Sequence, residues 1–164
     1  MVFFNKKIFE ENIYSPCIGS CMPLTEVADE VFSEKMMGEG IAFVLEENTV
    51  YSPCDGKIMM IAPTKHAFGI KSKSGTEVLV HIGLETAELN GEDFNVLVNL
   101  GDDVKAHDPI VNVDLDSVKK KNVDIITPLV ITNVDISNVC VISEETVNLN
   151  TVVCKIKKNK RWSR

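Results

Sequence analysis

The sequence predicts an all-β protein: an antiparallel β-sandwich or barrel built on a duplicated motif, with only short helical turns. Short apolar segments are separated by turn residues along most of the chain, and long helical patterns are scarce. A repeat points the same way: residues 14–22 read Y-S-P-C-I-G-S-C-M and residues 51–59 read Y-S-P-C-D-G-K-I-M. Tyr, Ser, Pro, Cys and Gly recur at identical offsets, which indicates two copies of one strand–turn unit.

Length and composition place the chain among ordinary globular domains. It has 164 residues, 45% of them hydrophobic, and a mean hydropathy of +0.06. It has no apolar run long enough for a membrane span and no signal-peptide pattern at its start. Its five cysteines lack metal-ligand spacing, so we expect a reducing, cytoplasmic location and small, buried cysteines in the Y-S-P-C turns.

Charge is distributed unevenly. The net charge is −7, yet the last ten residues hold six of the 17 basic side chains, which leaves 11 basic against 24 acidic elsewhere. An acidic body excludes nucleic acid as a partner and favours a basic protein. We expect residues 13–157 to form the domain, residues 158–164 a solvated basic tail, and residues 1–12 an extension.

The first half of the chain contains the clearer elements. Residues 1–12 favour a short helix packed on the domain, with peripheral membrane contact at most. Residues 28–37 predict a helix ended by G-E-G at 38–40, and residues 41–45 predict a strand. Residues 63–70 and 78–91 each contain an apolar, strand-like run, and together they predict a hairpin with a polar turn over 71–76, where Gly75 can take positive φ.

The second half predicts further short elements. A turn at 90–93 leads to a strand over 94–100, and a Gly/Asp-rich turn follows. Residues 114–121 favour one helical turn with aspartate at its start and lysines at its end. Strands are expected within 125–135, 139–143 and 152–156.

Two histidines carry the main functional indication. His66 and His81 lie fifteen residues apart on the two adjoining β segments, so a hairpin brings both imidazoles towards one surface. Neutral imidazole is a nucleophile near neutral pH, provided that one ring nitrogen is free and the other is hydrogen-bonded. A second histidine can donate to phosphoryl oxygens in the transition state, and Thr64 can orient one ring.

Other chemistries find less support in the sequence. Catalytic zinc normally takes three protein ligands, and no third ligand at suitable spacing accompanies the two histidines, so no metal site or cofactor is expected. The third histidine, His107, is interpreted as a solvated turn residue. Phosphate-binding glycine-loop motifs are absent, so direct nucleotide binding is not expected.

At these residues the chain resembles the glucose-type enzyme IIA domain of the bacterial phosphoenolpyruvate-dependent sugar phosphotransferase system. The resemblance runs from about residue 13 to residue 157 and rests on S-P-C-D-G-K-I, V-F-S-E-K-M-M-G-E-G-I-A, T-K-H-A-F-G-I, V-L-V-H-I-G-L-E-T-A-E-L-N-G and T-P-L-V-I-T-N. It implies a phosphoryl carrier on an antiparallel β-sandwich. His81 would accept the group from the phosphohistidine of HPr and pass it to a cysteine of the IIB domain of a sugar permease.

The resemblance also implies roles for neighbouring residues. His66 would support the phosphoryl group without being phosphorylated, and Thr64 would be the hydroxyl partner of the histidine pair. Partner docking would use a surface around the histidines: Asp29, Val31, Phe32, Met36, Met37, Leu79, Glu85 and Ala87. Adaptable methionine and phenylalanine side chains suit a surface that serves unlike partners, and some relatives also bind regulatory targets.

Two alternative functions remain open at this point. A zinc-dependent peptidase-like domain predicts a third metal ligand and tightly bound zinc. A biotinyl- or lipoyl-type binding module, suggested by G-D-D-V-K-A-H-D-P-I, needs a modifiable lysine at a hairpin tip, and Lys105 is poorly placed for that.

Overall fold

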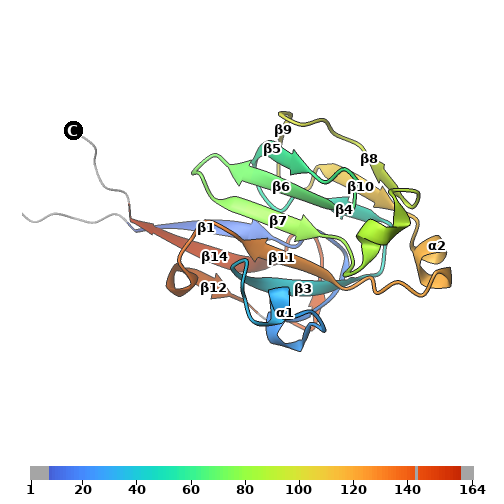
Figure 1. Ribbon diagram of the computed structural model, residues 1–164. Helices are drawn as coiled ribbons and strands as arrows, with labels where there is room; N and C mark the ends of the chain where they lie inside the picture. Colours follow the sequence, from blue (N-terminus) through green and yellow to red (C-terminus); the bar gives the residue numbers. More distant parts are fainter. Residues whose placement is uncertain (1–7, 143, 160–164) are drawn as a thin grey trace, which may run out of the picture.

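In the computed structural model, which describes residues 8–142 and 144–159, the chain folds into antiparallel β-sheets with a few short helices (Figure 1). The described residues form an eight-stranded sheet in the order β13-β2-β3-β11-β7-β6-β5-β9. Two three-stranded sheets, β1-β14-β12 and β4-β10-β8, pack against it. The predicted fold class is therefore confirmed.

The strands are short, as the sequence indicated. Their bounds are β1 Ile8–Tyr14, β2 Gly19–Pro23, β3 Glu39–Leu45, β4 Thr49–Tyr51, β5 Gly56–Ile61, β6 Ala67–Ser72, β7 Glu77–His81, β8 Phe94–Val96, β9 Asp103–Val104, β10 Pro109–Val113, β11 Thr127–Ile131, β12 Val139–Val141, β13 Thr146–Val147 and β14 Val152–Asn159. The helices are η1 Leu24–Glu26, α1 Glu30–Ser33, η2 Thr86–Leu89, α2 Leu115–Lys120 and η3 Ile136–Asn138. None of the helices in the described part of the chain is long and apolar enough to cross a bilayer.

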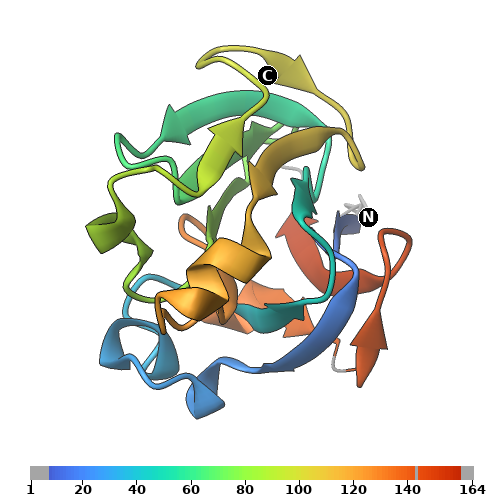
Figure 2. The same cartoon turned by 90° about the vertical axis from the view of Figure 1, so that its right-hand side faces the viewer.

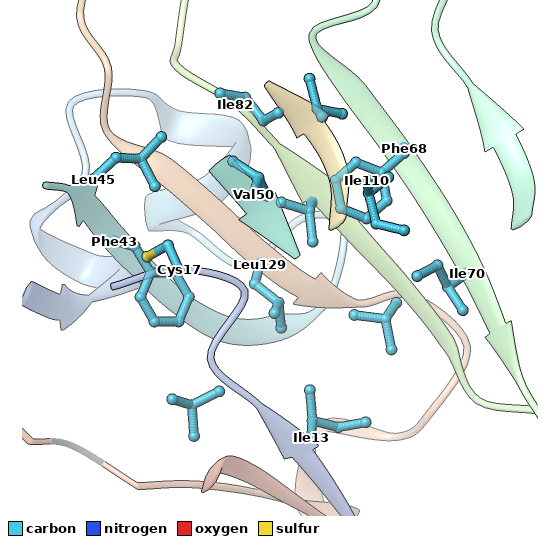
Figure 3. Packing of buried hydrophobic residues seen from close by; sticks show 14 of the residues in the cluster. Ile13, Cys17, Phe43, Leu45, Val50, Phe68, Ile70, Ile82, Ile110 and Leu129 are labelled. Atoms are coloured by element: carbon cyan, nitrogen blue, oxygen red, sulfur yellow. The ribbon is translucent and has the colours of Figure 1, made fainter. Parts of the chain in front are cut away.

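The main core lies between the large sheet and the two smaller ones (Figures 2 and 3). Inward-facing residues of the large sheet, such as Phe43, Phe68 and Leu129, are fully buried against Ile13 of β1 and Ile110 of β10. Their apolar surface supplies most of the driving force for folding, at about 25 cal/mol per Å² removed from water. A rigid sandwich of this kind holds side chains at its rim in fixed positions.

The two Y-S-P-C segments adopt the same structure. In each, the serine is fully buried and its hydroxyl donates to the cysteine carbonyl two residues on, at 2.7 Å for both Ser15 and Ser52. The copies also bond each other reciprocally, since Tyr14 N–H donates to Pro53 and Tyr51 N–H donates to Pro16. The repeat therefore marks a structural duplication.

The strand register extends this duplication over the large sheet. Gly19 of β2 pairs with Leu45 of β3, as Gly56 of β5 pairs with Ser72 of β6. The two halves, β13-β2-β3-β11 and β9-β5-β6-β7, meet where Leu129 of β11 pairs with Val80 of β7. Register positions therefore correspond between the two halves, apart from a bulge between Ile58 and Met60 in β5 that β2 lacks.

Several expectations are corrected at the ends of the chain. The helix expected over residues 1–12 is wrong for residues 8–12, which belong to β1; residues 1–7 lie outside the described part. β1 pairs with β14 from Ile8↔Asn159 to Tyr14↔Val152, so both strands run across the boundaries expected at residues 12 and 157. Local apolar periodicity favoured a helix, whereas pairing with a strand distant in sequence decided the structure.

Internal elements are mostly shorter than expected. α1 ends at Ser33 because Lys35 takes a left-handed φ of 56°, so the predicted helix over 28–37 stops well before the G-E-G sequence. The strand expected over 94–100 ends at Val96. The helical turn near 114–121 is confirmed as α2, capped by the Asp114 carboxylate.

Candidate functional site

The two predicted histidines meet at one end of the β6–β7 hairpin. Ala67 pairs with His81 across the hairpin, and the Ile82 amide donates to the His66 carbonyl at 2.7 Å. The imidazole rings lie 4.7 Å apart between centroids and meet edge to face at 77°. The sequence-based expectation that both rings share one surface is confirmed.

A backbone carbonyl fixes the orientation of His81. Its Nδ1 lies 2.6 Å from the carbonyl oxygen of Gly83, and since a carbonyl only accepts, the ring proton is on Nδ1. Nε2 therefore carries a lone pair, and no hydrogen bond from a described residue engages it. This is the arrangement that leaves one ring nitrogen ready to act as a nucleophile.

The turn after His81 is held rigidly. Gly83 has a φ of +81°, and a Cβ there would lie 2.3 Å from Thr86 Cγ2 and 2.8 Å from the Asp124 carbonyl oxygen. The buried Thr86 hydroxyl donates to the Ile82 carbonyl, and the Leu84 amide donates to Asp124. Only glycine fits the place from which the carbonyl reaches the imidazole.

His66 takes its position from a tight loop between β5 and β6. The Lys65 amide donates to the Ala62 carbonyl, and Lys65 has a left-handed φ of 62°. The loop places Thr64 Oγ1 2.6 Å from Nδ1 of His66, the contact that the sequence suggested. The hydroxyl can donate to this nitrogen and so leave the proton of the ring on Nε2.

Burial lowers the pKa of both histidines. For His66 the neighbouring His81 lowers the pKa further. For His81 the Gly83 carbonyl and the negative charge of Asp29 offset part of the effect of burial on its pKa. Both rings are therefore neutral near pH 7, which is the form that a nucleophilic imidazole requires.

The segment before β3 covers this site from one side. The Phe32 ring of α1 lies 5.4 Å from that of His81 and belongs to a second buried cluster with Leu79 and Val130. Asp29 caps α1, because its side chain accepts a hydrogen bond from the Val31 amide at 2.9 Å. α1 and the histidine hairpin are thereby fixed relative to each other.

The residues expected to dock partners fall into two groups. Five have exposed side chains: Val31, Met36, Met37, Glu85 and Ala87. Asp29 is half-buried, whereas Phe32 and Leu79 are 4% and 9% exposed and mainly support the surface from beneath. Of the three apolar side chains Val31, Met36 and Met37, Met36 is the most exposed, at 69%.

The remaining candidates lie elsewhere. His107 lies in a turn, as expected, but it is half-buried with its ring 5.2 Å from that of Tyr14, so it is less solvated than the sequence predicted. Cys17 and Cys54 are buried, and burial raises the pKa of each thiol to about 12, so neither is a nucleophile. Lys105 joins β9 and β10, which pair with other strands, so it does not occupy a hairpin tip.

Within residues 8–142 and 144–159, no group of three His, Cys, Asp or Glu side chains is arranged to hold a metal ion. Sequence reasoning did not identify the Gly83 carbonyl as the partner of His81. A glycine two residues after the histidine, at the end of an apolar strand, was the available signal.

Two neutral imidazoles, one with a fixed tautomer and a free Nε2, on the rim of a β-sandwich are typical of proteins that carry a transferable group on histidine. A family model described as phosphoenolpyruvate-dependent sugar phosphotransferase system, EIIA 1, matches residues 11–136. The chain belongs to this family, whose members are phosphotransferases that carry a phosphoryl group on a histidine during sugar uptake.

Individual relatives agree with the family. The glucoside-specific EIICBA component of the PTS system from Staphylococcus carnosus (strain TM300) is 49% identical over 127 residues, which is 77% of this chain and 18% of that protein. The structure titled glucose permease IIA from Mycoplasma capricolum superimposes with a TM-score of 0.84 at 41% identity, covering 94% of this chain and 99% of the other. These matches support neither the peptidase nor the biotinyl/lipoyl alternative.

Proposed function

We propose that His81 is the phosphorylated residue, accepting a phosphoryl group from phospho-HPr and passing it to the IIB cysteine of a sugar permease. The observation that carries this assignment is the bond from His81 Nδ1 to the Gly83 carbonyl. It leaves Nε2 as the nucleophilic nitrogen of a half-buried ring that lies beside a second imidazole. His66 is 8% exposed, so it is the poorer acceptor of the two.

The chemistry balances as two successive exchanges. The lone pair of His81 Nε2 attacks phosphorus as the N–P bond of the donor phosphohistidine breaks, and that ring leaves as neutral imidazole. The phosphorylated His81 ring is then cationic, and its Nδ1–H donates to the Gly83 carbonyl, which stabilises the charge. In the second exchange a cysteine thiolate attacks phosphorus, the N–P bond of His81 breaks and an S–P bond forms.

His66 supports the group as it moves. We assign the Thr64 hydroxyl as donor to Nδ1 of His66, so that His66 Nε2–H points its proton towards the phosphoryl oxygens. A fixed donor at this distance stabilises charge that spreads over those oxygens in the transition state. Because burial keeps the pKa of His66 low, the ring donates a hydrogen bond without becoming charged.

Partners dock on the apolar rim around the histidines. Val31, Met36 and Met37 present exposed apolar side chains, and flexible methionines adapt to two different partner surfaces. The Asp29 and Glu85 carboxylates favour encounter with a basic donor. We further propose that the protein is a cytoplasmic carrier without nucleic-acid partners. Glucose and glucoside permeases are the first acceptors to test, because the matched relatives carry those names.

The test mixes the protein with phosphoenolpyruvate, enzyme I and HPr and measures intact mass and acid lability. One added phosphoryl group, lost in acid as an N–P bond requires, is expected. The label should be absent from His81→Gln. Label that persists in His81→Gln would move the assignment to another residue.

Variants of the supporting residues separate acceptance from onward transfer. His66→Gln should still accept the group but pass it to IIB more slowly, by about 10²-fold. Thr64→Val should slow the same step by about tenfold, whereas Thr64→Ser keeps the hydroxyl and serves as the matched control. Equal rates for the Val and Ser variants would contradict the role of Thr64.

A further inference from the structure

A lysine-lined groove lies at the opposite end of the β5–β6 hairpin from the histidines. The groove has a volume of about 670 Å³, and four lysines from three segments line it: Lys57, Lys71, Lys73 and Lys105. Residues Ala67 and Ser72 mark the two ends of β6, so the groove is roughly 17 Å from the histidine pair along the strand. The groove is therefore separate from the proposed phosphorylation site.

Positive charge in the groove is only partly neutralised. Lys57 pairs with Asp103 at 3.4 Å on the surface, and Asp108 accepts a hydrogen bond from the Lys105 backbone amide. Among the described residues, no carboxylate forms an ion pair with the ammonium groups of Lys71, Lys73 or Lys105. In a chain of net charge −7, this is an unusual concentration of cations.

The arrangement also has an energetic cost. Lys57 and Lys71 pair directly across the antiparallel strands β5 and β6, so their side chains start from neighbouring positions on one face. Like charges placed opposite each other destabilise a sheet. A ligand that carries negative charge would remove this repulsion.

The other half of the sheet shows that the fold does not require these lysines. By register, Ser20 is the counterpart of Lys57 and Val44 the counterpart of Lys71. Asn148 corresponds to Lys105, since both begin equivalent turns closed by bonds to Thr151 and to Asp108. The same backbone is thus built there without a basic groove.

We propose that this groove binds a small phosphorylated molecule with at least two negative charges. Its volume is in the range of small-molecule sites, and lysine ammonium groups are common phosphate ligands. A second hollow of about 550 Å³ shares Lys73 and Lys105, but Glu11 and Asp55 also line it, so the first groove is the better anion site.

Calorimetric titration with inorganic pyrophosphate in metal-free, low-salt buffer tests the proposal. We expect saturable binding at one site, weakened at least about tenfold in Lys71→Gln/Lys73→Gln and weakened by added salt. Lys119→Gln/Lys120→Gln, which removes the same charge from α2, is the matched control and should stay within about twofold of wild type. Thermal unfolding checks that both variants fold.

Two further arms distinguish other sources of binding. His81→Gln should bind pyrophosphate as wild type does, which separates this groove from the histidine pair, and Lys71→Gln/Lys73→Gln should still accept the phosphoryl group. The proposal would be overturned if Lys71→Gln/Lys73→Gln and Lys119→Gln/Lys120→Gln lost pyrophosphate affinity equally. Loss of pyrophosphate binding in His81→Gln would also overturn it. Binding to anionic phospholipid vesicles without saturable pyrophosphate binding would also overturn it, since the lysines would then serve a membrane surface.

Discussion

The two halves of the large sheet share one backbone plan, yet only one of them carries the histidines. His81 stands in β7 where Val130 stands in β11, one residue beyond the Val80–Leu129 pair at which the halves meet. Val130 is 1% exposed in the second buried cluster, whereas His81 is half-buried at the rim. The same register position is therefore core in one half and candidate site in the other.

Different loops account for this difference. Between β2 and β3 the chain inserts η1 and α1, which bury Val130 and extend to His81 through Phe32. Between β5 and β6 the loop is much shorter, and it supplies Thr64 and His66 instead. The duplicated scaffold thus has only one histidine site, because the β2–β3 connection covers Val130 whereas the β5–β6 connection supplies Thr64 and His66.

The largest effect is expected from exchanging His81 and its counterpart in the other half, Val130. His81→Val should abolish phosphoryl acceptance, measured by intact mass, because it removes the nucleophile. Val130→His should not restore acceptance in that background, since Thr132, not glycine, stands at the counterpart of Gly83. It should also lower the free energy of unfolding by about 2–4 kcal/mol, because it buries an imidazole without a partner. Acceptance by the exchanged variant would show that the Gly83 carbonyl is dispensable.

The next effect concerns the turn that orients His81. Gly83→Ala places a methyl group against Thr86 and Asp124 at positive φ, and should cost about 2–4 kcal/mol of unfolding free energy and slow acceptance by about tenfold or more. Gly75→Ala is the matched control: Gly75 also has positive φ, but a Cβ there has nothing within 4 Å. Its cost should be about 1 kcal/mol, with acceptance unchanged. Chemical denaturation and single-turnover labelling measure both.

A smaller effect tests the duplication itself. Ser15→Ala and Ser52→Ala each remove a buried hydroxyl that donates to a cysteine carbonyl, and each should cost about 1–2 kcal/mol of unfolding free energy. Both hydroxyls donate the same bond, but Ser15 Oγ also accepts from the Cys17 amide at 3.2 Å. We therefore expect Ser15→Ala to cost as much as Ser52→Ala or up to about 1 kcal/mol more. A large disagreement would show that the halves differ in stability despite their common geometry.

The smallest effect is a pH dependence of the free energy of unfolding, which arises from the half of the sheet that carries the two histidines. The pKa values of His66 and His81 are lowered from 6.5 by burial, so the unfolded chain binds more protons just below that pH. The free energy of unfolding should be at its full value above about pH 6.5 and fall as pH decreases towards the lowered pKa values. His66→Gln/His81→Gln should flatten this slope in denaturation curves taken across that range. An unchanged slope would assign the dependence to other groups.

The sequence by itself determined the all-β class, the duplication and the pairing of the two histidines. These features rest on short-range information: alternating apolar residues, a repeated Y-S-P-C turn, and a polar turn between two strands. The contact between Thr64 and His66 was also predictable, because the two residues are only two positions apart in the chain.

Tertiary structure alone decided the rest. The strand at residues 8–14 forms because its partner is β14, more than a hundred residues away, and no local pattern reveals such a partner. Likewise, the Gly83 carbonyl reaches His81 only because Asp124 and Thr86 pack closely against Gly83 and hold the turn in one conformation. Contacts between distant segments overrode local preference at both places, since packing and hydrogen bonding outweigh the small differences in intrinsic propensity.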